Sequence, residues 1–186
     1  SDALVLNGEI KGLTHSDLYI TSYGESDSQI DTISTKNGKF SYEGAAFEEK
    51  PFVIYMDSGN VWITVWAKSG EKISIKGDAN YPELILAKGN NTSDLLSKFK
   101  EDNRSLIQER CDLRDKASQN KSMEDSLVLD IADGKIASNI LNLDSQLKNQ
   151  AEDFVRANPT SFASLVLIQD YILDVEEASA VKTYLD

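Results

Sequence analysis

The sequence predicts an α+β protein: an antiparallel β-sandwich or partly open barrel of about eight strands, followed by a helical segment of three to five helices. Short apolar runs fill the first half, with a turn about every ten residues. Near Asn90 the apolar spacing changes to recurrences of three and four residues, which is typical of amphipathic helices. We therefore expect a β domain at 1–90 and a helical segment at 91–186 packed on it, as two domains or as one unit.

The predicted strands are apolar runs that end at glycine, asparagine or serine turns. They are expected at 4–10, 18–20, 28–35, 39–45, 51–56, 61–66, 71–76 and 83–87. The strands at 28–35 and 39–45 flank Asn37-Gly38. Because Asn-Gly supplies the positive φ angles of a tight hairpin, these two strands are expected to pair antiparallel.

The first predicted helix follows Asn90 and has Thr92 or Ser93 as its N-cap. Its apolar positions are Leu95, Phe99, Leu106 and Leu113. A short helix is then expected to end at Gly134, before a longer one whose narrow apolar stripe forms a seam for another helix. This stripe comprises Ile136, Ile140, Leu143, Leu147, Ala151 and Phe154.

The stretch ANPTSFASLVLIQDYIL, residues 157–173, predicts a helix that is apolar on nearly every side. Asn158 is expected as its N-cap and Pro159 as its first residue, where a missing N–H costs nothing. Its broad face can dock on the apolar stripe of the preceding helix. Leu167 and Tyr171 lie on the other side, and two alternatives remain for them. Either the last segment, 175–185, covers them, or they form a docking face for a further domain.

Composition excludes several classes of function. With 31 acidic and 19 basic residues, the net charge of -12 disfavours binding to nucleic acid and to anionic lipid head groups. Cys111 is the only cysteine, so the sequence has no Cys-x-x-Cys pair and no thiolate zinc cluster. His15 is the only histidine, which rules out a two-histidine metal site. We expect no catalytic residue, no cofactor and no metal, and therefore not an enzyme. A third alternative is a hydrolase acting through carboxylates, which would need a deep cleft lined by two facing acidic residues.

The run VWITVW, residues 61–66, carries the most informative surface. Alternation along a strand places Trp62, Thr64 and Trp66 on one face and three aliphatic residues on the other. One face belongs to the core, and the other needs an explanation. The helical segment can cover it, since exposed aromatic patches are uncommon. Alternatively, the two tryptophans form a flat platform for a sugar ring or for a side chain of a partner.

Several short segments carry a resemblance to a known family. They are GEIKGL at 8–13, TKNGKFSYEG at 35–44, KISIKGD at 72–78, KGNNTSDLLSKF at 88–99 and NPTS at 158–161. In order and spacing the chain resembles the N-terminal domain of unknown function (DUF4369-like) of Bacteroidetes thioredoxin-like lipoproteins. The resemblance implies a bacterial cell-envelope location, as a periplasmic or outer-membrane lipoprotein whose only membrane contact is a lipid anchor.

In that family a C-terminal thioredoxin-like domain with a Cys-x-x-Cys pair follows the helical segment. The anchor and the redox domain both lie outside these 186 residues, and Cys111 does not correspond to a catalytic cysteine. The resemblance therefore implies a non-catalytic accessory domain that positions the redox domain or contacts its substrate or partner. The alternative is a glycan- or peptide-binding module of an envelope lipoprotein, with Trp62, Thr64 and Trp66 as its platform.

Overall fold

The computed structural model describes residues 2–14, 17–22, 29–59, 61–120 and 126–173, with the backbone alone at 126–130. The chain forms two compact units, Ser1–Lys98 and Phe99–Asp186. The division lies within the first helix, whereas the sequence predicted a boundary after Asn90. The first turns of that helix therefore belong to the β unit.

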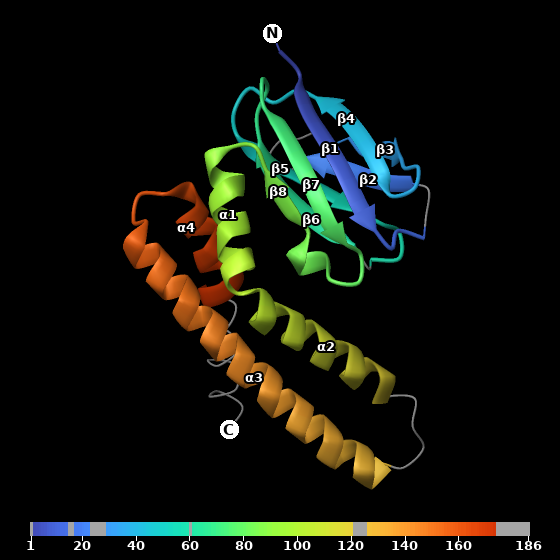
Figure 1. Ribbon diagram of the computed structural model, residues 1–186, viewed down its shortest axis with the longest axis vertical. Coiled ribbons are helices and arrows are strands. Elements are labelled where there is room, and N and C mark those ends of the chain that lie inside the picture. The colour runs from blue at the N-terminus through green and yellow to red at the C-terminus, as the bar shows by residue number, and fades with distance from the viewer. Residues whose placement is uncertain (1, 15–16, 23–28, 60, 121–125, 174–186) are drawn as a thin grey trace. The chain divides into compact units, whose positions relative to one another are not determined.

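Eight strands in the described part of the chain form two four-stranded sheets (Figure 1). The first sheet has the order β4 (Lys39–Gly44), β1 (Leu4–Lys11), β7 (Lys72–Asp78) and β8 (Leu86–Lys88). The second has the order β3 (Asp31–Ser34), β2 (Asp17–Ser22), β5 (Lys50–Tyr55) and β6 (Trp62–Ala67). All pairs are antiparallel except β1 with β7, which is parallel. The predicted α+β class is confirmed, and the sheets do not close into a barrel.

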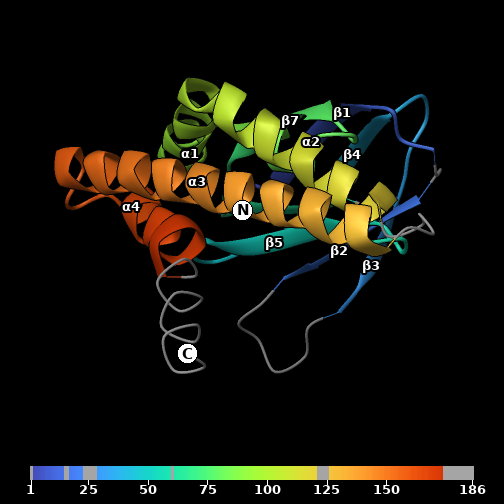
Figure 2. The same cartoon turned by 90° about the horizontal axis from the view of Figure 1, so that it is seen from below.

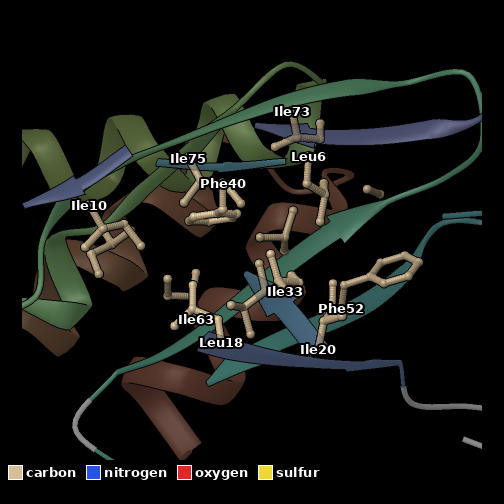
Figure 3. Close-up of a cluster of buried hydrophobic side chains, with 14 of the residues drawn as sticks. Leu6, Ile10, Leu18, Ile20, Ile33, Phe40, Phe52, Ile63, Ile73 and Ile75 are labelled. Carbon is tan, nitrogen blue, oxygen red and sulfur yellow. The ribbon is translucent and has the colours of Figure 1, made fainter. Parts of the chain in front are cut away.

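The inner faces of the two sheets share one hydrophobic core. Figure 3 shows Leu6 and Ile75 of the first sheet pointing toward Leu18 and Ile63 of the second. This core follows from alternation, because the residues that point inward along the strands are mostly apolar. Ten of its largest members are Leu6, Ile10, Leu18, Ile20, Ile33, Phe40, Phe52, Ile63, Ile73 and Ile75.

The Asn37-Gly38 turn forms as predicted, but the strands beside it do not pair as predicted. Asn37 and Gly38 have φ angles of 52° and 75°, and Lys36 and Lys39 exchange two backbone hydrogen bonds of 2.9 Å. Beyond that single bridge, β3 joins β2 in one sheet and β4 joins β1 in the other. The split lets Ile33 and Phe40 enter the same core from opposite sheets. The predicted pairing of 28–35 with 39–45 was therefore wrong.

Gly38 also meets a second requirement beyond its positive φ. Its carbonyl accepts a hydrogen bond of 2.9 Å from the Ile10 amide, so the turn lies directly against β1. A Cβ at this position would overlap the Ile10 carbonyl oxygen. No other residue type satisfies both the backbone angle and the close approach.

The predicted strand at 83–87 is only partly formed. Pro82–Leu84 makes a 3₁₀ turn, η1, and β8 starts at Leu86. Pro82 fixes its own φ and lacks the N–H that a strand ladder needs, which favours a helical turn at this point.

The helices are α1 (Asn91–Asp102), α2 (Arg104–Asn120), α3 (Ser126–Ala157) and α4 (Phe162–Leu167), continued by a π-helical turn, η2 (Ile168–Leu173). The cap of α1 is Asn90 and not the predicted Thr92 or Ser93. The Asn90 Oδ1 accepts a hydrogen bond of 2.8 Å from the Ser93 amide, and the Asn90 carbonyl accepts one of 2.9 Å from the Asp94 amide. Asn90 therefore satisfies backbone donors that would otherwise be unpaired at the helix start.

Two predicted helix boundaries were wrong. Gly134 does not end a helix, because it lies inside α3, which is 32 residues long. Asn158 does not cap the last helix, because its side-chain amide donates to the Phe154 carbonyl at 3.0 Å and so completes the end of α3. The N-cap of α4 is Ser161, whose hydroxyl accepts a hydrogen bond of 3.2 Å from the Ala163 amide.

Within the second unit, α2 runs beside α3 in both views (Figures 1 and 2). The predicted stripe of α3 is confirmed as a buried seam at Ile136, Leu143, Leu147 and Ala151. Val166 of α4 and Ile107 of α2 are also buried. Among the described residues, no helix combines the length and apolarity needed to span a lipid bilayer.

Candidate binding surface

Three aromatic side chains form a row across the outer face of the second sheet. Tyr19 of β2 lies directly opposite Tyr55 of β5, and Tyr55 lies directly opposite Trp62 of β6. The ring centroids of Tyr19 and Tyr55 are 5.7 Å apart, and those of Tyr55 and Trp62 are 5.3 Å apart, with an interplanar angle of 33° in each pair. We call Tyr19, Tyr55 and Trp62 the aromatic row.

Backbone pairing fixes this spacing. Directly opposite residues of neighbouring antiparallel strands have their side chains within contact distance, so three facing aromatic residues stack side by side. Trp62 is 53% exposed, whereas Tyr19 and Tyr55 are half-buried. The row therefore presents aromatic surface on the side of the sheet that faces away from the sandwich core.

The structure brings part of the predicted platform into this row. Val61, Ile63 and Val65 are buried, so Trp62, Thr64 and Trp66 share the opposite face as predicted. Thr64 is exposed and Trp66 is half-buried. Trp66 lies opposite Pro51 at the other end of β6, and its carbonyl accepts a hydrogen bond of 2.8 Å from the Asn90 side chain.

Sequence reasoning missed Tyr19 and Tyr55. Each lies in an apolar run, LYI and PFVIYM, where an aromatic residue is unremarkable by itself. Their contribution depends on the strand order β2-β5-β6 and on the register, neither of which the sequence alone supplies. The available signal was the alternation of residues along each strand. Tyr19 and Tyr55 alternate with the core residues Leu18, Ile20 and Ile54, which places both tyrosines on the outer face.

Two carboxylates lie at the Tyr19 end of the row. A hydrogen bond to Asp57 and the negative charge of Asp57 raise the pKa of the Tyr19 hydroxyl, with smaller effects from burial, Asp17 and Tyr55. Asp17 lies two residues before Tyr19 and therefore on the same face of β2, and both aspartates are exposed. This end of the surface is consequently acidic.

A second tyrosine with a raised pKa lies outside this surface. Burial raises the pKa of Tyr42 on β4, and its hydroxyl also donates a hydrogen bond of 3.2 Å to Asp31. Because Tyr42 packs against the sandwich core, this contact is part of the scaffold.

Leu167 and Tyr171, the predicted docking face, are buried at 1% and 4% exposure. The Tyr171 ring centroid lies 5.0 Å from that of Phe99, and the Arg110 guanidinium lies 6.0 Å from the Tyr171 centroid. These two side chains therefore offer no surface to a partner. The segment predicted to cover them, 175–185, lies outside the described residues.

The lone cysteine and the lone histidine of the chain are the side chains that nucleophilic catalysis would draw on first. Cys111 is half-buried on α2. His15 lies outside the described residues. Within the described ranges, no group of three or more His, Cys, Asp and Glu side chains is arranged to hold a metal ion. The aromatic row remains as the surface whose chemistry is suited to binding, through stacking, apolar contact or attraction of a cation.

One comparison with known proteins gives a match. A family model described as "Domain of unknown function (DUF4369)" matches residues 4–96, half of the 186-residue chain. The matched range contains all eight strands and the first turns of α1. No curated protein and no solved structure matches the chain.

Proposed function

The chain belongs to the DUF4369 family, and on that premise we propose that it is a non-catalytic accessory domain of a bacterial envelope thiol–disulfide oxidoreductase-like lipoprotein. In this role it positions a C-terminal thioredoxin-like domain or contacts the substrate or partner of that domain. The lipoprotein resides in the periplasm or at the outer membrane and contacts the bilayer only through its lipid anchor. The observation that carries the proposal is the family match over 4–96.

The cysteine content of the chain supports the non-catalytic part of the proposal. Reduction of a protein disulfide by a dithiol needs an attacking thiolate and a second, resolving cysteine. Cys111 is the only cysteine of the chain and is half-buried on α2, so the chain supplies no resolving cysteine. The redox chemistry is therefore assigned to another domain.

A disulfide-reduction assay on the 186-residue chain tests this function. We expect no turnover of a protein disulfide above the level of the Cys111→Ser variant. Turnover that persists in Cys111→Ser would contradict the non-catalytic role. In a longer protein that joins this chain to a redox domain, removal of residues 1–186 should lower turnover of a protein disulfide while leaving turnover of a small-molecule disulfide unchanged. Equal effects on both substrates would exclude the positioning role.

The aromatic row favours a second candidate function, a glycan- or peptide-binding module of an envelope lipoprotein. The specific observation is that Trp62 is 53% exposed and stacks beside Tyr55 on the outer face of the second sheet. Large aromatic side chains at a surface supply apolar contact area at low entropic cost, as they do in many binding sites.

A further inference from the structure

We propose that the aromatic row, with Asp17 and Asp57 at its Tyr19 end, binds a lysine- or arginine-bearing peptide segment of a partner protein. This inference deepens the proposed accessory role, on which it rests for its biological setting. It names the chemical class of the partner that the domain contacts. Its binding test needs no redox domain, so the two ideas can fail separately.

The geometry of the row suits an extended peptide. Tyr19, Tyr55 and Trp62 come from three adjacent strands, so the row runs across the sheet and perpendicular to the strands. The successive centroid distances of 5.7 Å and 5.3 Å leave no gap between neighbouring rings. A cationic group over an aromatic face within about 6 Å of the centroid is attracted by the negative potential of that face.

The charges of this face favour a cation. On the four strands of the second sheet, the outward positions are those that alternate with the core residues. They are Asp17, Tyr19, Thr21, Thr32, Ser34, Pro51, Val53, Tyr55, Trp62, Thr64 and Trp66. Asp17 is the only charged residue of this set, and Asp57 adds a second exposed carboxylate just beyond the end of β5. A lysine or arginine side chain placed over the row therefore meets no opposing basic residue on these strands.

The same charges distinguish a peptide from a glycan. A neutral sugar would stack on the rings but would gain no ion pair with Asp17 or Asp57. A cationic side chain gains the attraction of the aromatic face and a charge-assisted contact with a carboxylate. The net charge of -12 further attracts a basic segment over distance and repels an acidic one. A cationic peptide therefore gains charge attraction from both carboxylates, whereas a neutral glycan can only donate hydroxyl hydrogen bonds to them.

Calorimetric titration of the 186-residue chain tests the inference. The probe is an unstructured glycine-serine peptide with lysine at alternate positions. The comparison ligands are the same peptide with glutamate in place of lysine and a neutral cello-oligosaccharide. We expect saturable binding of the lysine peptide that weakens as salt is added, with no binding of the other two ligands.

Two surface changes localise the binding. Trp62→Ala should weaken binding of the lysine peptide about twofold to fivefold, which is the range expected for loss of one exposed cation–π contact. The double change Asp17→Asn and Asp57→Asn should weaken it to a similar extent and flatten the salt dependence. The matched controls are Phe47→Ala and Glu48→Gln, in the loop between β4 and β5, where Phe47 is 98% exposed. These two variants should bind as the parent chain does.

Several outcomes would overturn the inference. They are the absence of saturable binding by the lysine peptide, equal weakening in the control variants, and binding of the oligosaccharide in place of the peptide. Circular dichroism of each variant checks the fold, and the aspartate pair serves as the readout if Trp62→Ala is unfolded. Peptide binding together with disulfide turnover in Cys111→Ser would contradict the non-catalytic accessory role and support the binding surface. Absence of peptide binding together with absence of turnover would contradict the binding surface and leave the accessory role standing.

Discussion

At the residue scale, Arg110 is the most deeply buried charged side chain among the described residues of the helical unit. Its side chain is 7% exposed and donates a hydrogen bond of 2.7 Å to Asp144, whose side chain is 20% exposed. The guanidinium also lies 6.0 Å from the Tyr171 centroid. Arg110 thus links α2 to α3 through Asp144 and to η2 through Tyr171.

Removal of the Asp144 carboxylate should destabilise the protein substantially. Asp144→Ala takes a charged acceptor away from a cation that is largely withdrawn from water, so we expect a loss of about 2–4 kcal/mol in the free energy of unfolding. Arg110→Met should cost less, because it removes the buried charge and keeps apolar contact with Tyr171. Urea denaturation followed by circular dichroism measures both changes.

The matched control is an exposed pair on the same helix. Asp153 accepts a hydrogen bond of 3.1 Å from Arg156, and these side chains are 69% and 68% exposed. Asp153→Ala should change stability by no more than about 0.5 kcal/mol, since solvent screens surface ion pairs. If Asp144→Ala and Asp153→Ala have equal effects, the burial of Arg110 contributes nothing to stability.

The aromatic row shows which residues a sequence can and cannot identify. Strict alternation in VWITVW correctly separated the core face from the face of Trp62, because parity within one strand is a local property. Tyr19 and Tyr55 could not be joined to Trp62, because cross-strand neighbours depend on pairing between distant segments. Arg110 was equally hidden, since nothing in QERCDLRD marks one arginine as buried.

At the scale of elements, the long helix α3 carries a glycine that its fold does not require. Gly134 has no positive φ, is exposed, and has no atom within contact distance of the place a Cβ would occupy. It therefore lacks the conformational and steric reasons that explain Gly38. The helix continues through it because α3 packs along α2, and buried residues of its seam, among them Ile136 and Leu143, hold the backbone in place.

Gly134→Ala should stabilise the protein. Alanine restricts the unfolded chain and has a higher helix propensity, so we expect a gain of about 0.5–1 kcal/mol in the free energy of unfolding. Urea denaturation measures this gain. The reverse change at an exposed site on the same helix, Ala137→Gly, should cost a similar amount. A loss of stability in Gly134→Ala would mean that this glycine has a structural role that its surroundings do not show.

The existence of most elements could be predicted from the sequence, while several of their ends could not. Periodicity identified the strands and the α3 seam, because it reports which face of an element is buried. Glycine and asparagine are residue types that often mark helix ends. Packing of α3 outweighs the low helix propensity of Gly134, so the helix continues through it. Asn158 completes the C-terminal end of α3 and does not cap the start of α4. The Asn37-Gly38 turn was correctly predicted, yet a turn cannot specify which sheet each strand enters.

At the scale of the whole molecule, the β unit contains a complete core of its own. The buried cluster of the sandwich runs from Leu4 to Ile85 and, among the residues that the structure describes, includes none of the second unit. The start of α1 is attached to this unit by side-chain hydrogen bonds. The Ser97 hydroxyl donates to the Ala87 carbonyl at 2.6 Å, and the Asn90 side chain donates to the Trp66 carbonyl at 2.8 Å.

A fragment of residues 1–102 should therefore fold without the remaining helices and unfold cooperatively in urea. A fragment of residues 1–90 should be less stable by about 1–3 kcal/mol, because it lacks α1 and the hydrogen bonds that α1 makes with the sheets. Circular dichroism and tryptophan emission measure both transitions. An unfolded 1–102 fragment would show that the sandwich depends on the second unit, and equal stability of the two fragments would show that α1 contributes nothing.

The position of β1 has a consequence for biosynthesis. Of the eight described strands, β1 is synthesised before the others, but it lies between β4 and β7 in its sheet, with Val5 facing Lys72 in the parallel register. The ribosome must deliver the chain as far as Asp78 before β1 has both neighbours. Pairing β1 with β7 closes a long loop of chain, and the entropy cost of closing that loop slows folding. Domains dominated by pairing between strands distant in sequence fold in milliseconds to seconds. Until β7 emerges, β1 has an open edge, so a pause in translation before Asp78 would expose a nascent chain that is prone to aggregation.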